Sequence, residues 1–260
     1  MGRVGLKHVF LSFALLYGAA CYKYSYNYKL VGDTLPATRS APLQGPLAGA
    51  EGKPSCCKGP YCWEFTPLFN YDISALAFGV SHKFASKFDD VLAADVGLLW
   101  GENSAKELYK NVQLRVMMDH YDARWRNGVS FNLNEAANTH IATCDAGAFR
   151  AVKAIKAGDQ VRLRGWLVNA KISEKPGETD PARIMTWNGS VTREDQGEGA
   201  CELLYVPSAS SVEILKEGPR LWLWLKWLGL AGLLASAAAM ALAWHRRLKK
   251  DMAEADKAAF

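Results

Sequence analysis

The stretch from Leu221 to Trp244 is apolar over a length that suits a lipid bilayer. A helix needs about 20 mostly apolar residues to cross a hydrocarbon core of about 30 Å. The only charged residue in the stretch, Lys226, lies near its start, where a long side chain can reach the headgroups. Tryptophans flank the stretch at both ends, as interfacial residues do. The pattern predicts a transmembrane helix over 221–244.

A basic tail follows this helix at once, over residues 245–260, and it begins with His245, Arg246, Arg247, Lys249 and Lys250. Clusters of Lys and Arg beside a span stay in the cytoplasm. Within the span, small residues could allow close packing against another span: Gly229, Gly232, Ala235, Ser236 and Ala239.

The N-terminal segment, residues 1–23, has the form of a signal or anchor sequence. Basic residues precede a short apolar run, Val9–Ala20. Three outcomes are open: cleavage after Ala20, lipidation of Cys21, or an uncleaved anchor. Lys23 and the following tyrosines resemble an interfacial belt, which favours the anchor. Each outcome places the middle of the chain outside the cytoplasm, and the anchor places the chain in the inner (plasma) membrane with both termini in the cytoplasm.

The charge distribution argues against nucleic acid as a partner. The chain carries a net charge of +5, but residues 24–218 hold 21 Lys and Arg against 23 Asp and Glu. A nucleic-acid-binding domain carries its positive charge on the folded part. The predicted partners are therefore the lipid bilayer and other membrane or envelope proteins.

Residues 24–55 are rich in Pro, Gly and Ala, and they predict an extended linker. The following domain, residues 56–218, shows short β-like runs separated by turn residues. The expected strands are Tyr71–Val80, Val112–Met118, Val129–Leu133, Val161–Val168, Arg183–Val191 and Cys201–Val206.

Two helices are expected between these strands. The capping box formed by Ser104 and Glu107 predicts a helix over Ser104–Asn111. A stripe of apolar residues ending at Gly158 predicts another over Ala146–Ala157. The resulting fold class is α+β with mainly antiparallel strands, arranged as a sandwich or as a small barrel, of which an OB-like barrel is one form.

Five cysteines fall in the predicted domain: Cys56, Cys57, Cys62, Cys144 and Cys201. In an oxidising compartment they are candidates for disulfide bonds. We expect one bond between Cys144 and Cys201 and another among the three cysteines of the CCKGPYC segment.

Four segments resemble a poorly characterised family of bacterial cell-envelope proteins: DVGLLWGEN, NTHIA, GDQVRLRGWLV and TREDQGEGACELLYV. The most distinctive of them fits the pattern TRxDxGxGACE. The resemblance covers about Tyr71 to Val206. It implies a bacterial envelope setting, and it transfers no activity or catalytic residue.

The side chains with reactive chemistry gather in two segments, and they form one candidate cluster: His140, Cys144, Asp145, Arg193, Asp195 and Glu202. His140 and Cys144 would share the face of a helix and could join His82 or His120 in binding a metal, but Ile141 and Ala142 favour a strand. Glu202 could pair with Arg193. No catalytic, phosphate-binding or metal motif is present, so we assign no catalytic residue, metal or cofactor.

The favoured function is a non-catalytic, membrane-anchored component of an envelope assembly that presents a β-rich domain. The alternatives are an envelope enzyme that uses Cys144 or His140 near the Thr192–Glu202 loop, and an OB-like ligand-binding module.

Overall fold

The structure is a computed structural model that describes residues 5–47, 49, 52–82, 88, 90–117, 120–194 and 200–258. The chain divides into two compact units. One unit consists of Met1–Tyr24 together with Arg220–Phe260, and the other consists of Ser25–Pro219.

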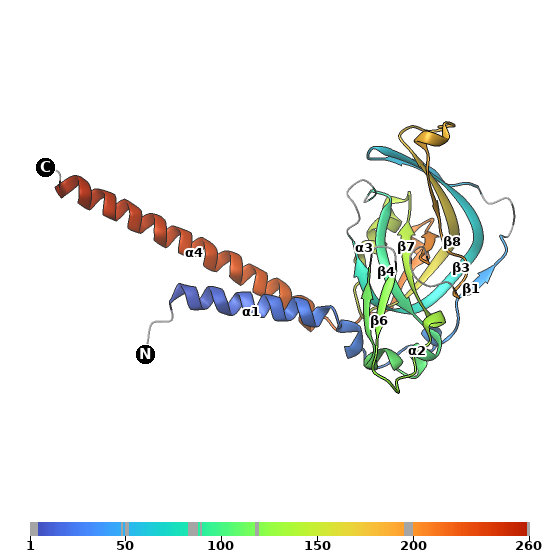
Figure 1. Ribbon diagram of the computed structural model, residues 1–260, viewed down its shortest axis with the longest axis horizontal. Helices are drawn as coiled ribbons and strands as arrows, with labels where there is room; N and C mark the ends of the chain where they lie inside the picture. The colour runs from blue at the N-terminus through green and yellow to red at the C-terminus, as the bar shows by residue number, and fades with distance from the viewer. Residues whose placement is uncertain are drawn as a thin grey trace. The chain divides into compact units, whose positions relative to one another are not determined.

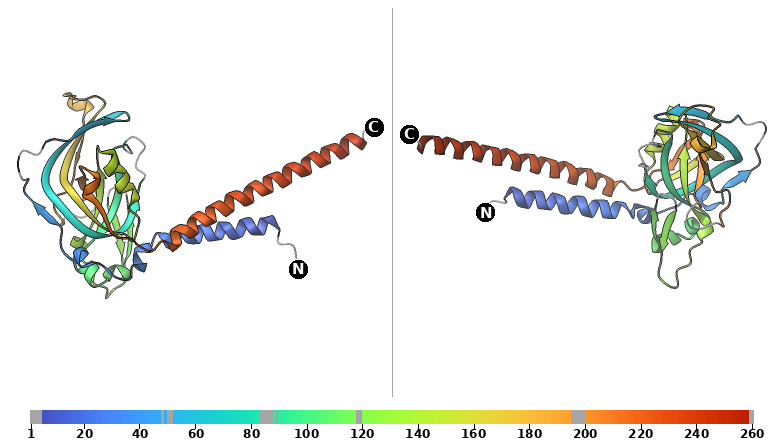
Figure 2. Two further views of the ribbon diagram at one scale, coloured as in Figure 1. Left: turned by 180° about the vertical axis from the view of Figure 1, so that it is seen from behind. Right: turned by 45° about the horizontal axis from the view of Figure 1, so that its top comes forward.

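The first unit is a pair of helices, α1 (Leu6–Tyr24) and α4 (Leu221–Ala258), which lie side by side (Figures 1 and 2). Among the described residues, α4 alone is long and apolar enough to cross a membrane. The predicted span is therefore a helix, as expected, but the helix does not end at Trp244 and continues through the basic tail.

The two helices pack closely at glycines of α4. A Cβ atom added at Gly229 would lie 2.9 Å from the backbone of Tyr17, and one added at Gly232 would collide with the ring of Phe13. Residue numbers rise along α4 as they fall along α1, so the helices are antiparallel. The span thus packs through two of its predicted small residues against the N-terminal helix of the same chain.

The second unit is mainly β-structure. Its strands are β1 (Leu43–Gly45), β2 (Ser55–Lys58), β3 (Tyr61–Ser81), β4 (Leu92–Leu99), β5 (Gln113–Val116), β6 (Tyr121–Arg124), β7 (Ala136–Ala142), β8 (Gln160–Ser173), β9 (Met185–Asn188), β10 (Glu202–Tyr205) and β11 (Val212–Lys216). Its α-helices are α2 (Gly101–Ala105) and α3 (Ala146–Ala154). Short 3-10 turns lie at Asn27–Leu30, Pro36–Arg39, Leu108–Asn111, Leu133–Glu135, Pro181–Arg183 and Ala209–Ser211.

Five strands pair in the order β3, β4, β7, β10 and β8, and β8 pairs again with β3. All of these pairings are antiparallel except that of β7 with β10, which is parallel. Strands β3 and β8 are the longest, and Figure 1 shows both as curved ribbons that lie side by side. The predicted α+β class with mainly antiparallel strands is confirmed.

The main hydrophobic core lies on one face of these strands. Residues of β8 that alternate along the strand, Val161 and Leu163, point into this core with Ala148 and Val152 of α3. Asp145 caps α3 by accepting a hydrogen bond from the backbone N–H of Ala148 (2.6 Å). The helix ends at Ala154, three residues before the predicted end, because Ile155 has an extended backbone (φ −61°, ψ 136°), and the left-handed Gly158 (φ 94°) lies in the turn beyond it.

The β5–β6 hairpin covers the outer face of β3 and β4. Gly79 and Gly97 lie opposite each other across these strands. An added Cβ at either position would meet the side chain of Val116 on β5. The two glycines leave the space that the hairpin needs.

Three sequence-based expectations are wrong. The segment Val129–Leu133 is no strand, since its apolar residues Val129 and Phe131 pack against a hydrophobic cluster from an irregular segment. Helix α2 begins at Gly101 instead of Ser104, and the left-handed backbone of Glu107 (φ 52°) separates it from the following 3-10 turn. The buried Ser104 hydroxyl bonds Thr38 instead of capping a helix (2.8 Å).

The expected linker over 24–55 is also wrong, because the chain from Ser25 onward belongs to the second unit and Leu43–Gly45 forms strand β1, which pairs with β3. Tyr28 is fully buried, and its hydroxyl group donates to the Val112 carbonyl (2.9 Å) and accepts from the N–H of Leu114 (2.8 Å). Gln160 holds the backbone of Asp33 and Leu35 through its side-chain amide. The composition of this segment did not indicate that Tyr28 is buried or that Gln160 binds the backbone of the segment.

Gly165 lies where β8 and β10 approach most closely. An added Cβ would collide with the carbonyl oxygen of Tyr205, so Gly165→Ala should lower the free energy of unfolding by about 1–3 kcal/mol. Gly45→Ala is the matched control, because no atom lies within 4 Å of its added Cβ. Denaturant unfolding of the full chain in detergent measures both. Equal midpoints for the two variants would contradict the close approach.

Candidate functional site

A buried carboxylate forms the centre of the candidate site. Glu202 is 3% exposed, and it accepts hydrogen bonds from the hydroxyl groups of Tyr71 (2.7 Å) and Thr139 (2.8 Å). Glu202 pairs directly with Thr139 across the parallel strands β10 and β7. Strand pairing therefore brings together three polar side chains from β3, β7 and β10 on the face that carries the main core.

The charge of Glu202 affects its neighbour. Burial raises the pKa of Tyr71 well above its ordinary value of 10.0, and the carboxylate of Glu202 raises it further. Arg193 opposes this shift. Tyr71 is therefore a neutral hydrogen-bond donor to Glu202.

Arg193 lies among aromatic rings beside this carboxylate. Its guanidinium carbon is 5.9 Å from the ring centroids of both Tyr71 and Trp100. One of its terminal nitrogens, Nη2, donates to the side chain of Gln44 (3.3 Å). The structure thus brings Arg193 and Glu202 to one site, as expected, although Glu202 takes its hydrogen bonds from two hydroxyl groups.

A second buried polar pair lies on the opposite face of β7. His140 follows Thr139, and successive side chains of a strand point to opposite faces. Its Nδ1 contacts the carboxylate of Asp95 on β4, which lies opposite it in register. The His140 ring meets Trp187 of β9 edge-to-face with centroids 4.7 Å apart. Burial raises the pKa of Asp95, and the contact with His140 lowers it in part.

Two other members of the predicted cluster, Cys144 and Asp145, serve the fold. Cys144 forms a disulfide with Cys56, and Asp145 is the cap of α3. Asp195 lies outside the described residues. Among the described residues, no group of three or more His, Cys, Asp or Glu could hold a metal ion.

The expected pairing of Cys144 with Cys201 is wrong. Cys144 bonds Cys56, and Cys57 bonds Cys62, which lies opposite it in the β2–β3 hairpin. Cys201 takes part in neither bond, and its sulfur accepts a hydrogen bond from the side-chain amide of Asn138 (3.4 Å). The spacing of the cysteines along the chain could not show that β2 lies next to the residues that precede α3.

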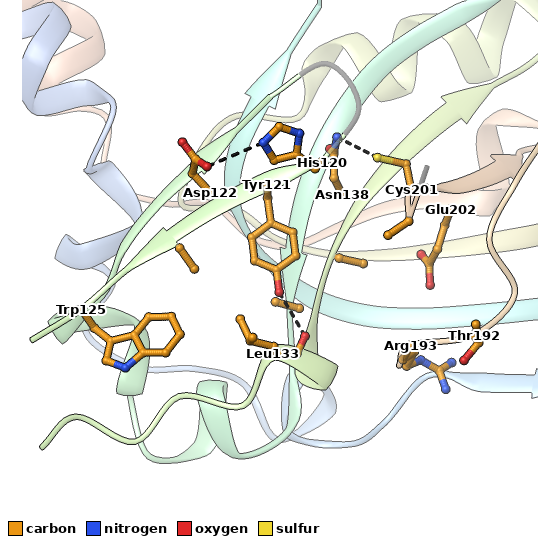
Figure 3. A pocket seen from close by; sticks show the side chains of 14 residues that line it. His120, Tyr121, Asp122, Trp125, Leu133, Asn138, Thr192, Arg193, Cys201 and Glu202 are labelled. Carbon is orange, nitrogen blue, oxygen red and sulfur yellow. Dashed lines mark hydrogen bonds and ion pairs between the residues drawn. The ribbon is translucent and has the colours of Figure 1, made fainter. Parts of the chain in front are cut away.

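A pocket of about 300 Å³ opens beside Glu202. Figure 3 shows Tyr121, Trp125 and Leu133 on one side of it, and Thr192, Arg193 and Glu202 on the other. Asn138 and Cys201 line it between these walls. The hydroxyl group of Tyr121 donates to the Leu133 carbonyl (3.0 Å), and burial raises the pKa of Tyr121 to about 12.

Four residues of these two sites were absent from the predicted cluster: Tyr71, Asp95, Asn138 and Thr139. The run Asn138-Thr139-His140 gives a signal, since three polar residues occur inside a segment with strand composition. Tyr71 gives none, because an aromatic residue at the start of an apolar run is ordinary in a core strand.

Comparison of the chain with protein-family models, with curated proteins and with solved structures gives no match.

The hydroxyl bonds to Glu202 should stabilise the fold measurably. Tyr71→Phe leaves a buried carboxylate with one donor fewer, which costs about 1–3 kcal/mol in the free energy of unfolding. The same change in a Glu202→Gln background should cost less, because the acceptor is then neutral. A double-mutant cycle in denaturant measures the difference. Additive effects would mean that the two side chains do not interact.

Peptide mapping without reduction tests the disulfides. We expect linked peptides for Cys56 with Cys144 and for Cys57 with Cys62, while Cys201 takes an alkylating reagent after unfolding. Removing the first bond with Cys56→Ser and Cys144→Ser should cost about 2–4 kcal/mol. The control, Cys201→Ser, preserves both disulfides. A linked peptide that joins Cys144 to Cys201 would contradict the structure.

Proposed function

We propose that this protein is a membrane-anchored component of a bacterial cell-envelope assembly, which presents a β-rich domain outside the cytoplasm and has no catalytic activity of its own. Its partners are the lipid bilayer and other membrane or envelope proteins. Both termini lie in the cytoplasm, so the 19-residue helix α1 also crosses the bilayer, with the side chains of Lys7 and His8 extended to the headgroups.

The location is supported by three features that agree with one another. Helix α4 is long and apolar enough to span a bilayer, and basic residues follow its apolar part. Helix α1 packs against α4 in the antiparallel direction, as an uncleaved anchor would. Two disulfides in the second unit fit an oxidising compartment.

The architecture that we propose for the domain is an OB-like barrel. The circuit of pairings through β3, β4, β7, β10 and β8 returns to β3, which is what a five-stranded barrel requires. The parallel pairing of β7 with β10 and the position of α3 between β7 and β8 support this form over a sandwich.

One observation supports the non-catalytic role. The candidate reactive side chains Cys144, His140 and Glu202 are each bonded to, or packed against, other residues of the fold. Cys144 is in a disulfide, so it has no thiolate to act as a nucleophile. His140 is 1% exposed, between Asp95 and Trp187. Glu202 is bound by two hydroxyl groups. An enzyme that uses Cys144 or His140 would need these partners to be released.

Reporter insertions test the topology. A reporter that is active only outside the cytoplasm should give a signal when inserted at Gly177, in an exposed turn, and no signal when fused after Phe260. A cytoplasmic position for the Gly177 insertion would overturn the proposed location.

Partner recovery and a conservative variant test the role. Detergent extraction of the native protein should recover membrane partners in stoichiometric amounts, and His140→Gln should leave both this recovery and the cellular phenotype unchanged. Arg183→Gln, at an exposed position, is the matched control. A folded His140→Gln protein that retains its partners but loses the phenotype would favour the enzyme.

A further inference from the structure

Two residues that line the pocket beside Glu202 each have a buried polar atom that forms no hydrogen bond with the described part of the chain. Asn138 is 2% exposed, and its Oδ1 accepts no hydrogen bond from any described residue. The amide orientation is set by the other end of the side chain, whose nitrogen donates to the carbonyl of Met117 (3.0 Å) and to Cys201. The Nε of Arg193 is likewise buried and donates to none of the described residues.

These two atoms have opposite hydrogen-bonding character. The Asn138 oxygen needs a donor, and the Arg193 Nε–H needs an acceptor. Buried polar groups without partners cost free energy, so a ligand that supplies both would be bound favourably at this wall. Hydroxyl groups donate and accept at once, which fits a ligand that carries several of them.

The charges that line the pocket argue against an ionic ligand. One arginine faces two carboxylates, Asp122 and Glu202, so the pocket offers no excess positive charge to an anion. Both carboxylates are already engaged, Asp122 with His120 (3.6 Å) and Arg124 (3.6 Å), and Glu202 with its two hydroxyl donors. A cation would therefore compete with existing partners.

The opposite wall is aromatic. Trp125 is 40% exposed, and its ring lies 5.7 Å from that of Phe131 (centroid to centroid), which holds it at the edge of the pocket. An exposed indole can pack against the apolar C–H face of a sugar ring, while the hydroxyl groups of the sugar point to the polar wall. The volume of about 300 Å³ lies at the small end of ligand pockets.

We infer that this pocket binds a small neutral polyhydroxylated ligand, a mono- or disaccharide unit. The ligand lies between Trp125 on one side and the polar side chains of Asn138 and Arg193 on the other. The inference rests on the proposed non-catalytic role, because the pocket is proposed to hold the sugar without converting it. It assigns to the presented domain a ligand of a definite chemical class.

Calorimetric titration of the full chain tests this assignment. The protein is kept in a zwitterionic detergent, since a sugar-headed detergent would occupy the site. The probes are glucose, N-acetylglucosamine and maltose, with inorganic phosphate and ethylammonium as charged probes. We expect saturable binding of at least one sugar with a dissociation constant of about 1 mM or tighter, and no competition by either ion.

Three variants locate the binding. Trp125→Ala should weaken it about tenfold through loss of the stacking surface. Arg193→Lys keeps the charge but removes the planar Nε donor, so it should weaken sugar binding as well. Met185→Ala, which removes an exposed apolar side chain from β9 outside this pocket, should leave the affinity unchanged. Unfolding midpoints close to that of the unmodified protein exclude misfolding as the cause.

Two results would overturn the assignment: stronger binding of phosphate or ethylammonium than of any sugar, or no saturable binding of a sugar up to about 10 mM. Neither result affects the topology. A cytoplasmic signal from the Gly177 reporter, in turn, would overturn the proposed role and leave the measured sugar affinity standing.

Discussion

The pairing of β3 with β8 is the constraint on which the domain depends. It runs from Cys62 opposite Ser173 to Leu76 opposite Gln160, and it joins the first long strand to one that follows α3. Without it the strands β3, β4, β7, β10 and β8 would form an open sheet with two exposed edges. The pairing also sets the candidate site, because it holds Tyr71 beside Gly165, where β10 approaches closely enough for Glu202 to accept the Tyr71 hydroxyl.

Side chains alternate along β7, so its buried polar residues point to opposite faces of the sheet and form two separate clusters. Thr139 faces the core and helps to hold Glu202, whereas His140 faces the other side and contacts Asp95. Residues that are adjacent in sequence thus belong to separate clusters. Asn138, the residue before Thr139 on β7, lines the pocket, and its Oδ1 accepts no hydrogen bond from the described residues.

Much of the fold could be predicted from local patterns. The membrane helix, a helix beginning at Ala146 and the strands around Val161 and Leu203 were evident from apolar length and period, although the helix ends at Ala154 and not at Ala157. Strand β4 was missed because it is buried on both faces, so its residues show no alternation. The partners of Cys144, Glu202 and Tyr28 could not be found, since each lies more than 60 residues away in the sequence and is brought close by strand pairing that sequence spacing does not reveal.

Native-state hydrogen exchange of the full chain tests the central claim, closure of the strand circuit, most directly. If β3 and β8 close it, their paired amides near Ile73 and Leu163 should exchange only through global unfolding, with the same free energy as those of β7 and β10. Exchange of the β3 and β8 amides through a separate opening of lower free energy, while β4 and β7 remain protected, would contradict closure.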